Sequence, residues 1–308
     1  MDGLSQFLSA VRVEGSLFSR AEMRAPWGVQ TRGAGVGIFH VVVQGGGFIE
    51  VDGLDGAVGF RAGDLLVLPH GHGHVLRDLP GSPFRHILEW PSETGADGLP
   101  CVLAGAEGPT TSLLCGTVSL DPEARDLLLQ LLPPLVHVRG GGSAATWLDS
   151  TLRLMAEELN ATRPGGAALV ARLADLLFVH VLRSWIEQAP AGTRGWLTAL
   201  ADPRLARALG NIHGDPGRSW SVDELAREAG MSRSAFFNAF SEQVGETPAA
   251  YLLRWRMALA RARLRRGSDG IAAVAEAVGY GSEAAFSRAF KRHVGESPSV
   301  WRRRARAA

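Results

Sequence analysis

One segment of sequence occurs twice in the last part of this chain. The letters LAREAGMSRSAFFNAFSEQVGETP run from Leu225 to Pro248, and VAEAVGYGSEAAFSRAFKRHVGESP runs from Val274 to Pro298. From Phe236 onward the two copies are offset by 50 residues, so that Phe236 corresponds to Phe286. Self-similarity of this kind indicates a repeated supersecondary unit, and each copy has the pattern of a helix, a short turn and a second helix.

Local signals define the two helices of the first copy. Ser221 and Glu224 form a capping-box pattern at a helix start. Gly230 can take the left-handed conformation that ends this helix, and Ser232 can cap the next one. A short helix followed by a tight turn and a second helix is therefore predicted here.

The second helix of the first copy has two different faces. Phe236 and Phe240 are four residues apart, so they lie on one side and are predicted to anchor the helix in a core. A helix held in this way can present its opposite side to a DNA major groove, where Arg and Asn side chains make paired hydrogen bonds to base edges. The residues predicted on that side are Arg233, Ser234, Phe237 and Asn238.

The second copy follows the same plan. Ser268 is the predicted cap, Gly279 lies in the turn, and Phe286 and Phe290 point inward. The segment 249–266 between the copies contains neither Gly nor Pro and is predicted to be one helix that joins the two units. The residues predicted on the outward face of the second recognition helix are Glu283, Ala284, Ser287 and Arg288.

Charge separates the two parts of the chain. Residues 218–308 hold 16 Lys and Arg against 9 Asp and Glu, whereas residues 1–217 hold 16 against 22. A basic segment gains affinity for phosphates by releasing counterions. The acidic front and the basic back therefore indicate different partners, and the basic part is predicted to bind double-stranded DNA.

Residues from about 202 to 304 resemble the DNA-binding domain of the AraC/XylS family of transcription regulators, through the two repeated motifs quoted above. The resemblance implies two helix-turn-helix units joined by a long helix, with base contacts from the outward faces of both recognition helices. Phe237 departs from the polar residue expected at such a site, and it can either contact a thymine methyl group or pack.

The front of the chain, from about residue 10 to 120, alternates short apolar runs with Gly- and Pro-rich turns, which predicts a β-sandwich or barrel. Gly63, Pro69, Gly71 and His74 fit a spacing that resembles the second motif of the cupins, which are double-sheet jelly rolls. The first cupin motif is poorly matched, because Val42 stands where a second histidine after His40 is expected. This departure argues against metal catalysis in the cupin manner.

Histidines mark a candidate effector or metal site in this part. His72 and His74 alternate along the chain and would share one face of a strand, and His40 and His86 lie in neighbouring strand candidates. Converging imidazoles could bind a divalent metal such as zinc, nickel or iron, and without metal they could orient an effector. The alternative is that the segment around His72 is a turn with solvated or hydrogen-bonded rings.

Cys101 and Cys115 are the chain's two cysteines. They would form a redox switch if both were exposed and adjacent. The commoner role of such cysteines is that of a small apolar core residue, and Cys115 has the surroundings of a buried strand.

The middle of the chain, residues 121–190, has helical periodicity. An apolar stripe that includes Leu169, Leu173 and Leu176 exceeds what a connector needs, so it either packs inside the chain or pairs with a second copy. We expect an α+β multidomain protein with three parts: a cupin-like jelly-roll effector domain over 1–120, a helical dimerisation or linker region over 121–190, and an all-α DNA-binding domain with two helix-turn-helix units over 191–308.

Several classes of protein are disfavoured by the sequence as a whole. Neither a signal peptide nor an apolar run of membrane-spanning length is found, and two cysteines make no disulfide framework, so a cytoplasmic location is expected. The function predicted is a ligand-responsive transcription regulator and not an enzyme, with DNA, a small-molecule effector, a second copy of the chain and RNA polymerase as candidate partners. The alternatives are a metal- or redox-sensing regulator and a metal-dependent cupin enzyme fused to a DNA-binding domain.

Overall fold

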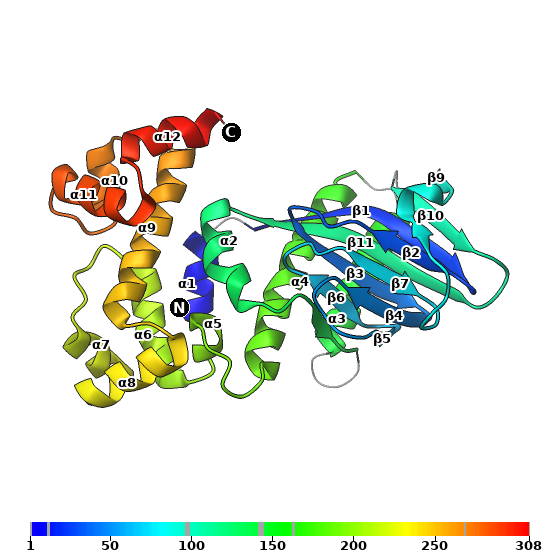
Figure 1. Ribbon diagram of the computed structural model, residues 1–308, viewed down its shortest axis with the longest axis horizontal. Coiled ribbons are helices and arrows are strands. Elements are labelled where there is room, and N and C mark those ends of the chain that lie inside the picture. Colours follow the sequence, from blue (N-terminus) through cyan, green and yellow to red (C-terminus); the bar gives the residue numbers. More distant parts are fainter. Residues whose placement is uncertain are drawn as a thin grey trace. The chain divides into compact units, whose positions relative to one another are not determined.

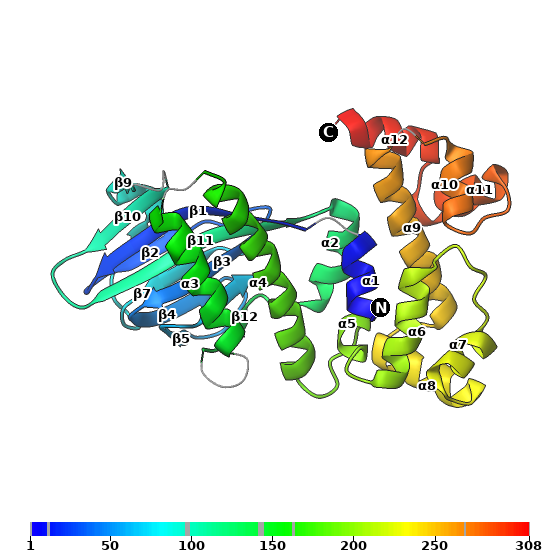
Figure 2. The same ribbon diagram turned by 180° about the vertical axis from the view of Figure 1, so that it is seen from behind.

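The chain forms two compact units. The computed structural model describes residues 2–10, 13–95, 99–140, 145–161, 164–267 and 269–307 (Figures 1 and 2). The first unit, called the barrel unit, contains Val13–Leu120 and Leu132–Trp185. The second, called the helical unit, contains Met1–Arg12, Asp121–Leu131 and Ile186–Ala308.

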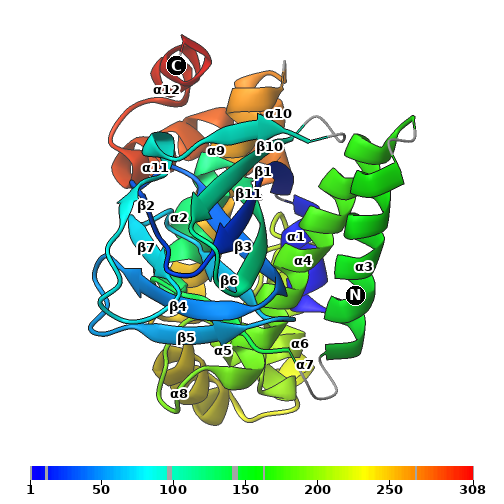
Figure 3. The same cartoon turned by 90° about the vertical axis from the view of Figure 1, so that its right-hand side faces the viewer.

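The barrel unit is built from two facing β-sheets (Figure 3). A seven-stranded sheet has the strand order β12-β6-β3-β11-β1-β10-β9, and a five-stranded sheet has the order β5-β4-β7-β2-β8. The strands are β1 (Val13–Arg24), β2 (Gly28–Thr31), β3 (Gly37–Gln44), β4 (Gly46–Val51), β5 (Val58–Arg61), β6 (Leu65–Leu68), β7 (His74–Arg77), β8 (Arg85–His86), β9 (Ser92–Thr94), β10 (Pro100–Gly105), β11 (Thr110–Leu120) and β12 (Val136–Val138). The 3-10 helix η1 spans Ile87–Glu89.

Alternation along β3 explains why both faces of the larger sheet are buried. Ile38 and Val42 point between the two sheets, where they pack with side chains such as Ile49 of the smaller sheet. Phe39 and Val41 point the other way and pack against two helices, α3 (Ala145–Ala161) and α4 (Gly166–Gln188). Figure 2 shows these helices lying across that face. The sheet-rich front that the sequence predicts is therefore confirmed.

The apolar stripe of α4 is divided between two surroundings. Leu173 and Leu177 are buried against the sheet, whereas Leu169 and Leu176 are exposed by 40% and 50%. His180 is half-buried and stacks on Trp147, with ring centroids 3.4 Å apart. The stripe thus serves as core on one side and leaves leucines in solvent on the other.

The helical unit contains two helix-turn-helix motifs joined by α9. Its elements are α1 (Gly3–Ala10), α2 (Pro122–Leu128), η2 (Leu129–Leu131), α5 (Trp196–Ala199), α6 (Pro203–Gly214), α7 (Val222–Ala229), α8 (Arg233–Val244), α9 (Pro248–Arg266), α10 (Ile271–Ala277), α11 (Glu283–Val294) and α12 (Pro298–Ala307). Helices α7 and α8 form the first motif and α10 and α11 the second, as the repeated sequence predicts.

The predicted helix boundaries of the first motif are confirmed in detail. Ser221 and Glu224 form a reciprocal capping box at the start of α7, and Gly230 ends that helix with a φ of 68°. Ser232 caps α8 by accepting from the backbone N–H of Ala235. In the second motif, Ser268 lies outside the described residues, and Gly270 occupies the cap position of α10 without a side-chain hydrogen bond.

The division of the chain differs from the expected one, because a segment of the expected barrel domain, Met1–Arg12, and a segment of the expected middle region, Asp121–Leu131, belong to the helical unit. Helix α1 packs on α6, and its Phe7 is fully buried with its ring centroid 4.5 Å from that of Trp196 and 5.2 Å from that of Trp255. Helix α2 packs on α9. The helical unit is therefore larger than residues 191–308, and its core includes a side chain from the start of the chain.

Replacing Phe7 by Ala should lower the free energy of unfolding of the helical unit by about 3–5 kcal/mol, because a fully buried ring would leave a cavity among aromatic side chains. Chemical denaturation followed by tryptophan fluorescence measures this loss. Phe237→Ala is the matched control, because Phe237 is already 39% exposed and its loss should cost much less. Equal effects of the two substitutions would contradict the assignment of α1 to this core.

Candidate nucleic-acid interface and barrel site

The first recognition helix, α8, is oriented by its two anchoring phenylalanines. Phe236 and Phe240 are fully buried, with ring centroids 5.5 Å apart. Because the anchors occupy one face, the residues predicted for DNA contact lie on the other, and all of them are exposed: Arg233, Ser234, Phe237 and Asn238. The helix thus presents one guanidinium, one amide, one hydroxyl and one aromatic ring to solvent.

Arg233 is held by a carboxylate of the neighbouring helix. Its Nη1 lies 2.5 Å from Oδ2 of Asp223 on α7, and both side chains are more than half exposed. An ion pair this exposed adds little stability, because water screens it. Arg233 can therefore exchange this partner for a base or a phosphate at small cost.

The second recognition helix, α11, has the same construction. Phe286 and Phe290 are fully buried with centroids 5.4 Å apart, and Ser282 caps the helix at Ala285 N–H. Of the residues predicted to face DNA, three are exposed and one, Ser287, is half-buried: Glu283, Ala284, Ser287 and Arg288. The structure therefore places both predicted sets on the solvent-facing sides of their helices.

Helix α9 connects the two motifs without interruption. At its start, Tyr251 and Trp255 are buried beside the first motif, and towards its end Leu264 is buried in the core of the second. Arg256, in the middle, donates from Nε to the carbonyl of Pro216 at 2.7 Å and from Nη2 to that of Arg218 at 2.9 Å. These bonds fix the turn before α7 onto the connector.

Basic side chains are distributed unequally between the motifs. The span from Val222 to Val244 holds two arginines and four acidic residues, whereas the span from Ile271 to Val294 holds three basic and two acidic residues. Helix α12, which follows, adds four arginines. Three of these four are already engaged, because Arg304 is paired with Glu296 and Arg302 and Arg306 donate to backbone carbonyls. Attraction to phosphates should therefore come mainly from the second motif.

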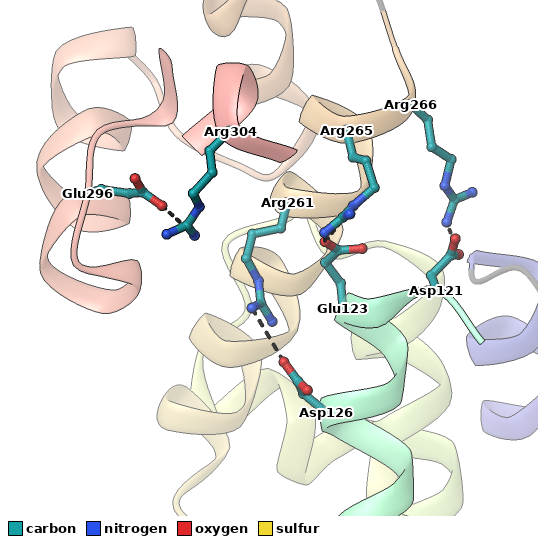
Figure 4. A network of polar contacts seen from close by, with 8 residues as sticks. All are labelled: Asp121, Glu123, Asp126, Arg261, Arg265, Arg266, Glu296 and Arg304. Carbon is teal, nitrogen blue, oxygen red and sulfur yellow. Dashed lines mark hydrogen bonds and ion pairs between the residues drawn. The ribbon is translucent and has the colours of Figure 1, made fainter. Parts of the chain in front are cut away.

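Three arginines of α9 are already paired with carboxylates of α2 (Figure 4). We call this set, which joins Asp121 to Arg266, Glu123 to Arg265 and Asp126 to Arg261, the α2–α9 ion-pair network. Glu123 is its buried member: its side chain is 3% exposed, and its Oε1 accepts from Nε and Nη2 of Arg265 at 3.0 and 2.7 Å.

This network was not predicted from the sequence. The available signal was the acidic run in DPEARD together with arginines four apart in α9, but neither pattern says that the two helices meet. The network neutralises part of the positive charge that the sequence assigns to the C-terminal segment.

Two of the predicted histidines meet inside the barrel unit, together with one of the cysteines. His40 on β3 is paired in register with Cys115 on β11, and its Nδ1 lies 3.1 Å from that Sγ. Nε2 of His40 lies 2.9 Å from Nε2 of His74 on β7, and Nδ1 of His74 lies 3.2 Å from the carbonyl of His72. One set of tautomers satisfies every member, with the Cys115 thiol donating to His40, His40 to His74, and His74 to the carbonyl.

Burial sets the charge state of this network. Burial, and then the neighbouring His74, holds the pKa of His40 well below 6.5. Burial also lowers the pKa of His74, against the opposing effects of the His72 carbonyl and Asp52. Burial raises the pKa of the Cys115 thiol to about 12, with the hydrogen bond from Ser19 acting in the opposite direction. At neutral pH the whole network is therefore uncharged.

The remaining predicted site residues lie elsewhere. The ring of His72 lies beside that of His70, and Nδ1 of His86 accepts from the backbone N–H of Leu88. Cys101 is on β10, which β1 separates from β11, so the adjacency that a redox switch with Cys115 requires is not met. Within the described residues, no group of three or more His, Cys, Asp or Glu side chains has the geometry of a metal site.

Over the described part of the chain, no helix combines the length and apolar character that crossing a bilayer needs.

The chain is similar to known proteins over most of its length. A cupin family model matches residues 2–187, and a helix-turn-helix domain model matches residues 225–304. Putative AraC-like transcription regulators of Streptomyces lividans and Streptomyces antibioticus are 36% and 37% identical, each over 92% of this chain and over 92% and 93% of their own lengths. A solved transcriptional regulator from Chromobacterium violaceum, with an AraC-type DNA-binding domain, is 27% identical over 35% of this chain and 96% of that chain, with a TM-score of 0.33.

These matches, together with the two exposed recognition helices, define a DNA-binding transcription regulator that joins a cupin domain to a helix-turn-helix domain. The chain belongs to the AraC-like transcription regulators.

The buried histidines predict acid sensitivity of the barrel unit. A histidine in the unfolded chain titrates near 6.5, whereas His40 and His74 titrate lower when folded, so the unfolded chain binds more protons below that pH. The free energy of unfolding should therefore fall as pH drops from about 7 to about 5, by up to about 1.4 kcal/mol per pH unit for each histidine.

Denaturation of the full chain at several pH values tests this dependence. His40→Gln should flatten the slope by removing one group whose pKa is lowered in the folded chain. A wild-type barrel transition that is independent of pH in this range would contradict the assignment.

Proposed function

We propose that both recognition helices read DNA sequence directly. The contacts would come from Arg233, Ser234, Phe237 and Asn238 on α8, and from Glu283, Ala284, Ser287 and Arg288 on α11. The observation that carries this proposal is the exposure of both faces on helices whose opposite sides are fixed by buried phenylalanines. Arginine and asparagine can each make paired hydrogen bonds to a base edge, and the exposed ring of Phe237 suits a thymine methyl group.

The connecting helix α9 sets the spacing of the two recognition helices. Because α9 is one continuous helix, the two recognition helices would enter successive major-groove turns, roughly 34 Å apart on one face of the duplex. Where the duplex must bend to engage both, the deformation costs roughly 1–6 kcal/mol and depends on the sequence that is bent. Affinity should then depend also on base pairs that no side chain touches.

The barrel unit would sense a small-molecule effector. Its interior is apolar except for a few groups such as His40 and His74, and apolar lining with a few fixed polar groups is typical of ligand sites. Since the imidazoles are neutral and already hydrogen-bonded, an effector would have to displace one of their present hydrogen bonds and replace it with its own. The effector would act by binding one domain arrangement more tightly than another, which changes the affinity for DNA.

A second copy of the chain is the partner we propose for the outer face of α4. Leu169 and Leu176 are exposed there, and Leu154 of the adjoining α3 is 39% exposed. A homodimer would cover these leucines and present four recognition helices, two from each chain, to a palindromic site. Regulation would take place in the cytoplasm, in contact with chromosomal DNA and RNA polymerase.

A metal-sensing regulator is the second candidate: His40, His74 and Cys115 meet, but among the described residues they do not have the geometry of a metal site as they stand. Zinc, nickel or iron would have to displace the present hydrogen bonds, because His40 already uses both ring nitrogens. Metal analysis of the purified protein tests this candidate. A redox sensor is less well supported because Cys115 is buried, and an enzyme is the least supported alternative because the first cupin motif is incomplete.

Arg288→Ala in the full chain should weaken specific DNA binding by about 1–3 kcal/mol and relax the preference at one base position. Selection of bound fragments from random DNA, followed by titration at several salt concentrations, measures both effects. Arg32→Ala is the matched control, because it removes an exposed arginine from the barrel unit. Wild-type affinity and sequence preference in the Arg288 variant would refute the groove assignment.

Leu176→Glu should convert the dimer to a monomer, because it buries a charge at the proposed interface. Analytical ultracentrifugation at micromolar concentration gives the oligomeric state. Leu79→Glu, which changes a leucine that is 61% exposed elsewhere on the barrel unit, should leave the dimer intact. A wild-type chain that sediments as a monomer would exclude this interface at that concentration.

A further inference from the structure

A solvent-open cavity of about 570 Å³ lies on the helical unit, and no residue of either recognition helix lines it. It is lined by residues of α1, the end of α6 and the last turns of α9, by Pro216, Gly267 and Asp269, and by Ala277 of α10. Its volume falls within the range of small-molecule sites, which extends from about 300 to 1,000 Å³. Neither the recognition helices nor the barrel network uses this space.

Small apolar side chains leave room for a ligand body on one wall. Ala262 of α9 and Ala277 of α10 contribute only methyl groups, and Leu259 adds a larger apolar surface beside them. A compact hydrocarbon or aromatic ring would remove this surface from water, which stabilises the complex. The wall therefore suits the apolar part of a small organic molecule.

Two arginines supply positive charge on the same wall. Arg263 and Arg266 are three residues apart on α9, so their side chains lie on one side of the helix, and both line the cavity. Within the described residues, the exposed guanidinium of Arg263 has neither an ion-pair nor a hydrogen-bond partner. Arg266 has one, Asp121 of the α2–α9 ion-pair network. One whole guanidinium and part of a second are thus available to an anion.

The other polar groups limit the charge of the ligand. Asp269 also lines the cavity and places a negative charge near the two arginines. A multiply charged anion would meet stronger repulsion from Asp269 than a single carboxylate would. Gln6 and Ser9 of α1 add neutral hydrogen-bonding groups.

We propose that this cavity binds a small organic monoanion, namely a carboxylate with a compact apolar body. The carboxylate pairs with Arg263 and Arg266, in the charge-assisted geometry that guanidinium groups favour, and the apolar body packs on Ala262 and Ala277. The ligand competes with Asp121 for Arg266. Because α1 and α10 line the same space, the bound molecule contacts the first segment of the chain and the second helix-turn-helix motif together.

Binding of 4-fluorobenzoate to the full chain, followed by ¹⁹F NMR line broadening, tests the proposal. Its neutral amide, 4-fluorobenzamide, is the matched probe. We expect the carboxylate to bind and the amide to bind at least about tenfold more weakly, because a hydrogen-bonded charge is lost. Absence of carboxylate binding at 10 mM, on the order of the weakest useful affinity, or equal binding of the two probes would overturn the proposal.

Three variants locate the site. Arg263→Gln should weaken carboxylate binding by about tenfold, and Ala262→Phe should abolish it by filling the cavity. Asp121→Asn should act in the opposite direction and tighten binding, because Arg266 loses its competitor. Circular dichroism and thermal unfolding confirm that each variant is folded, and Arg263→Gln changes only an exposed side chain.

Carboxylate binding that is unchanged in both Arg263→Gln and Asp121→Asn would place the probe elsewhere and refute this site. That result would not bear on the proposed DNA binding or effector sensing, because carboxylate binding in this cavity is proposed independently of both. Conversely, loss of DNA binding in the Arg288 variant says nothing about this cavity.

Discussion

Packing along α9 is the contact on which the rest of the helical unit depends. One side of its first turns is buried against the aromatic side chains of the first motif, and Met257, Ala260 and Leu264 are buried in the core of the second. Each recognition helix is then fixed to this single connector by its own pair of phenylalanines. Because both anchors lie on one continuous helix, the direction and spacing of the two reading faces are set together.

Most of this arrangement can be read from the sequence because its signals are local. The capping box at Ser221, the left-handed glycine at Gly230 and the pairs of phenylalanines four apart all act within a few residues. The repeat strengthens the prediction, because two segments with the same local signals should form the same helix-turn-helix unit. The strands of the barrel follow in the same way from alternation, as in β3, where Ile38 and Phe39 enter different cores.

What the sequence did not predict depends on contacts between distant segments. Nothing near Phe7 says that its ring lies between Trp196 and Trp255, so the front helix was assigned to the barrel. The histidine network also depends on contacts between segments that are distant in the sequence. Alternation identifies His74 as a candidate, but only the register of β3 with β11 places Cys115 beside His40. The spacing could not show that the rings of His72 and His86 take no part in that network, in which His72 contributes only its carbonyl.

The same nonlocal contacts change the electrostatic argument for DNA binding. The excess of basic residues after residue 217 treats every arginine as available to phosphates, yet Arg261, Arg265 and Arg266 are already paired with α2. Arg254 is likewise paired with Glu246, and Arg256 is bound to backbone carbonyls. Much of the charge of α9 therefore holds the unit together. In α12, Arg304 is paired with Glu296, and Arg302 and Arg306 donate to the carbonyls of Asp269 and Gly267. The charge that remains for DNA is therefore concentrated on α11, so the second motif should dominate the salt dependence of binding while the first contributes mainly uncharged contacts to bases.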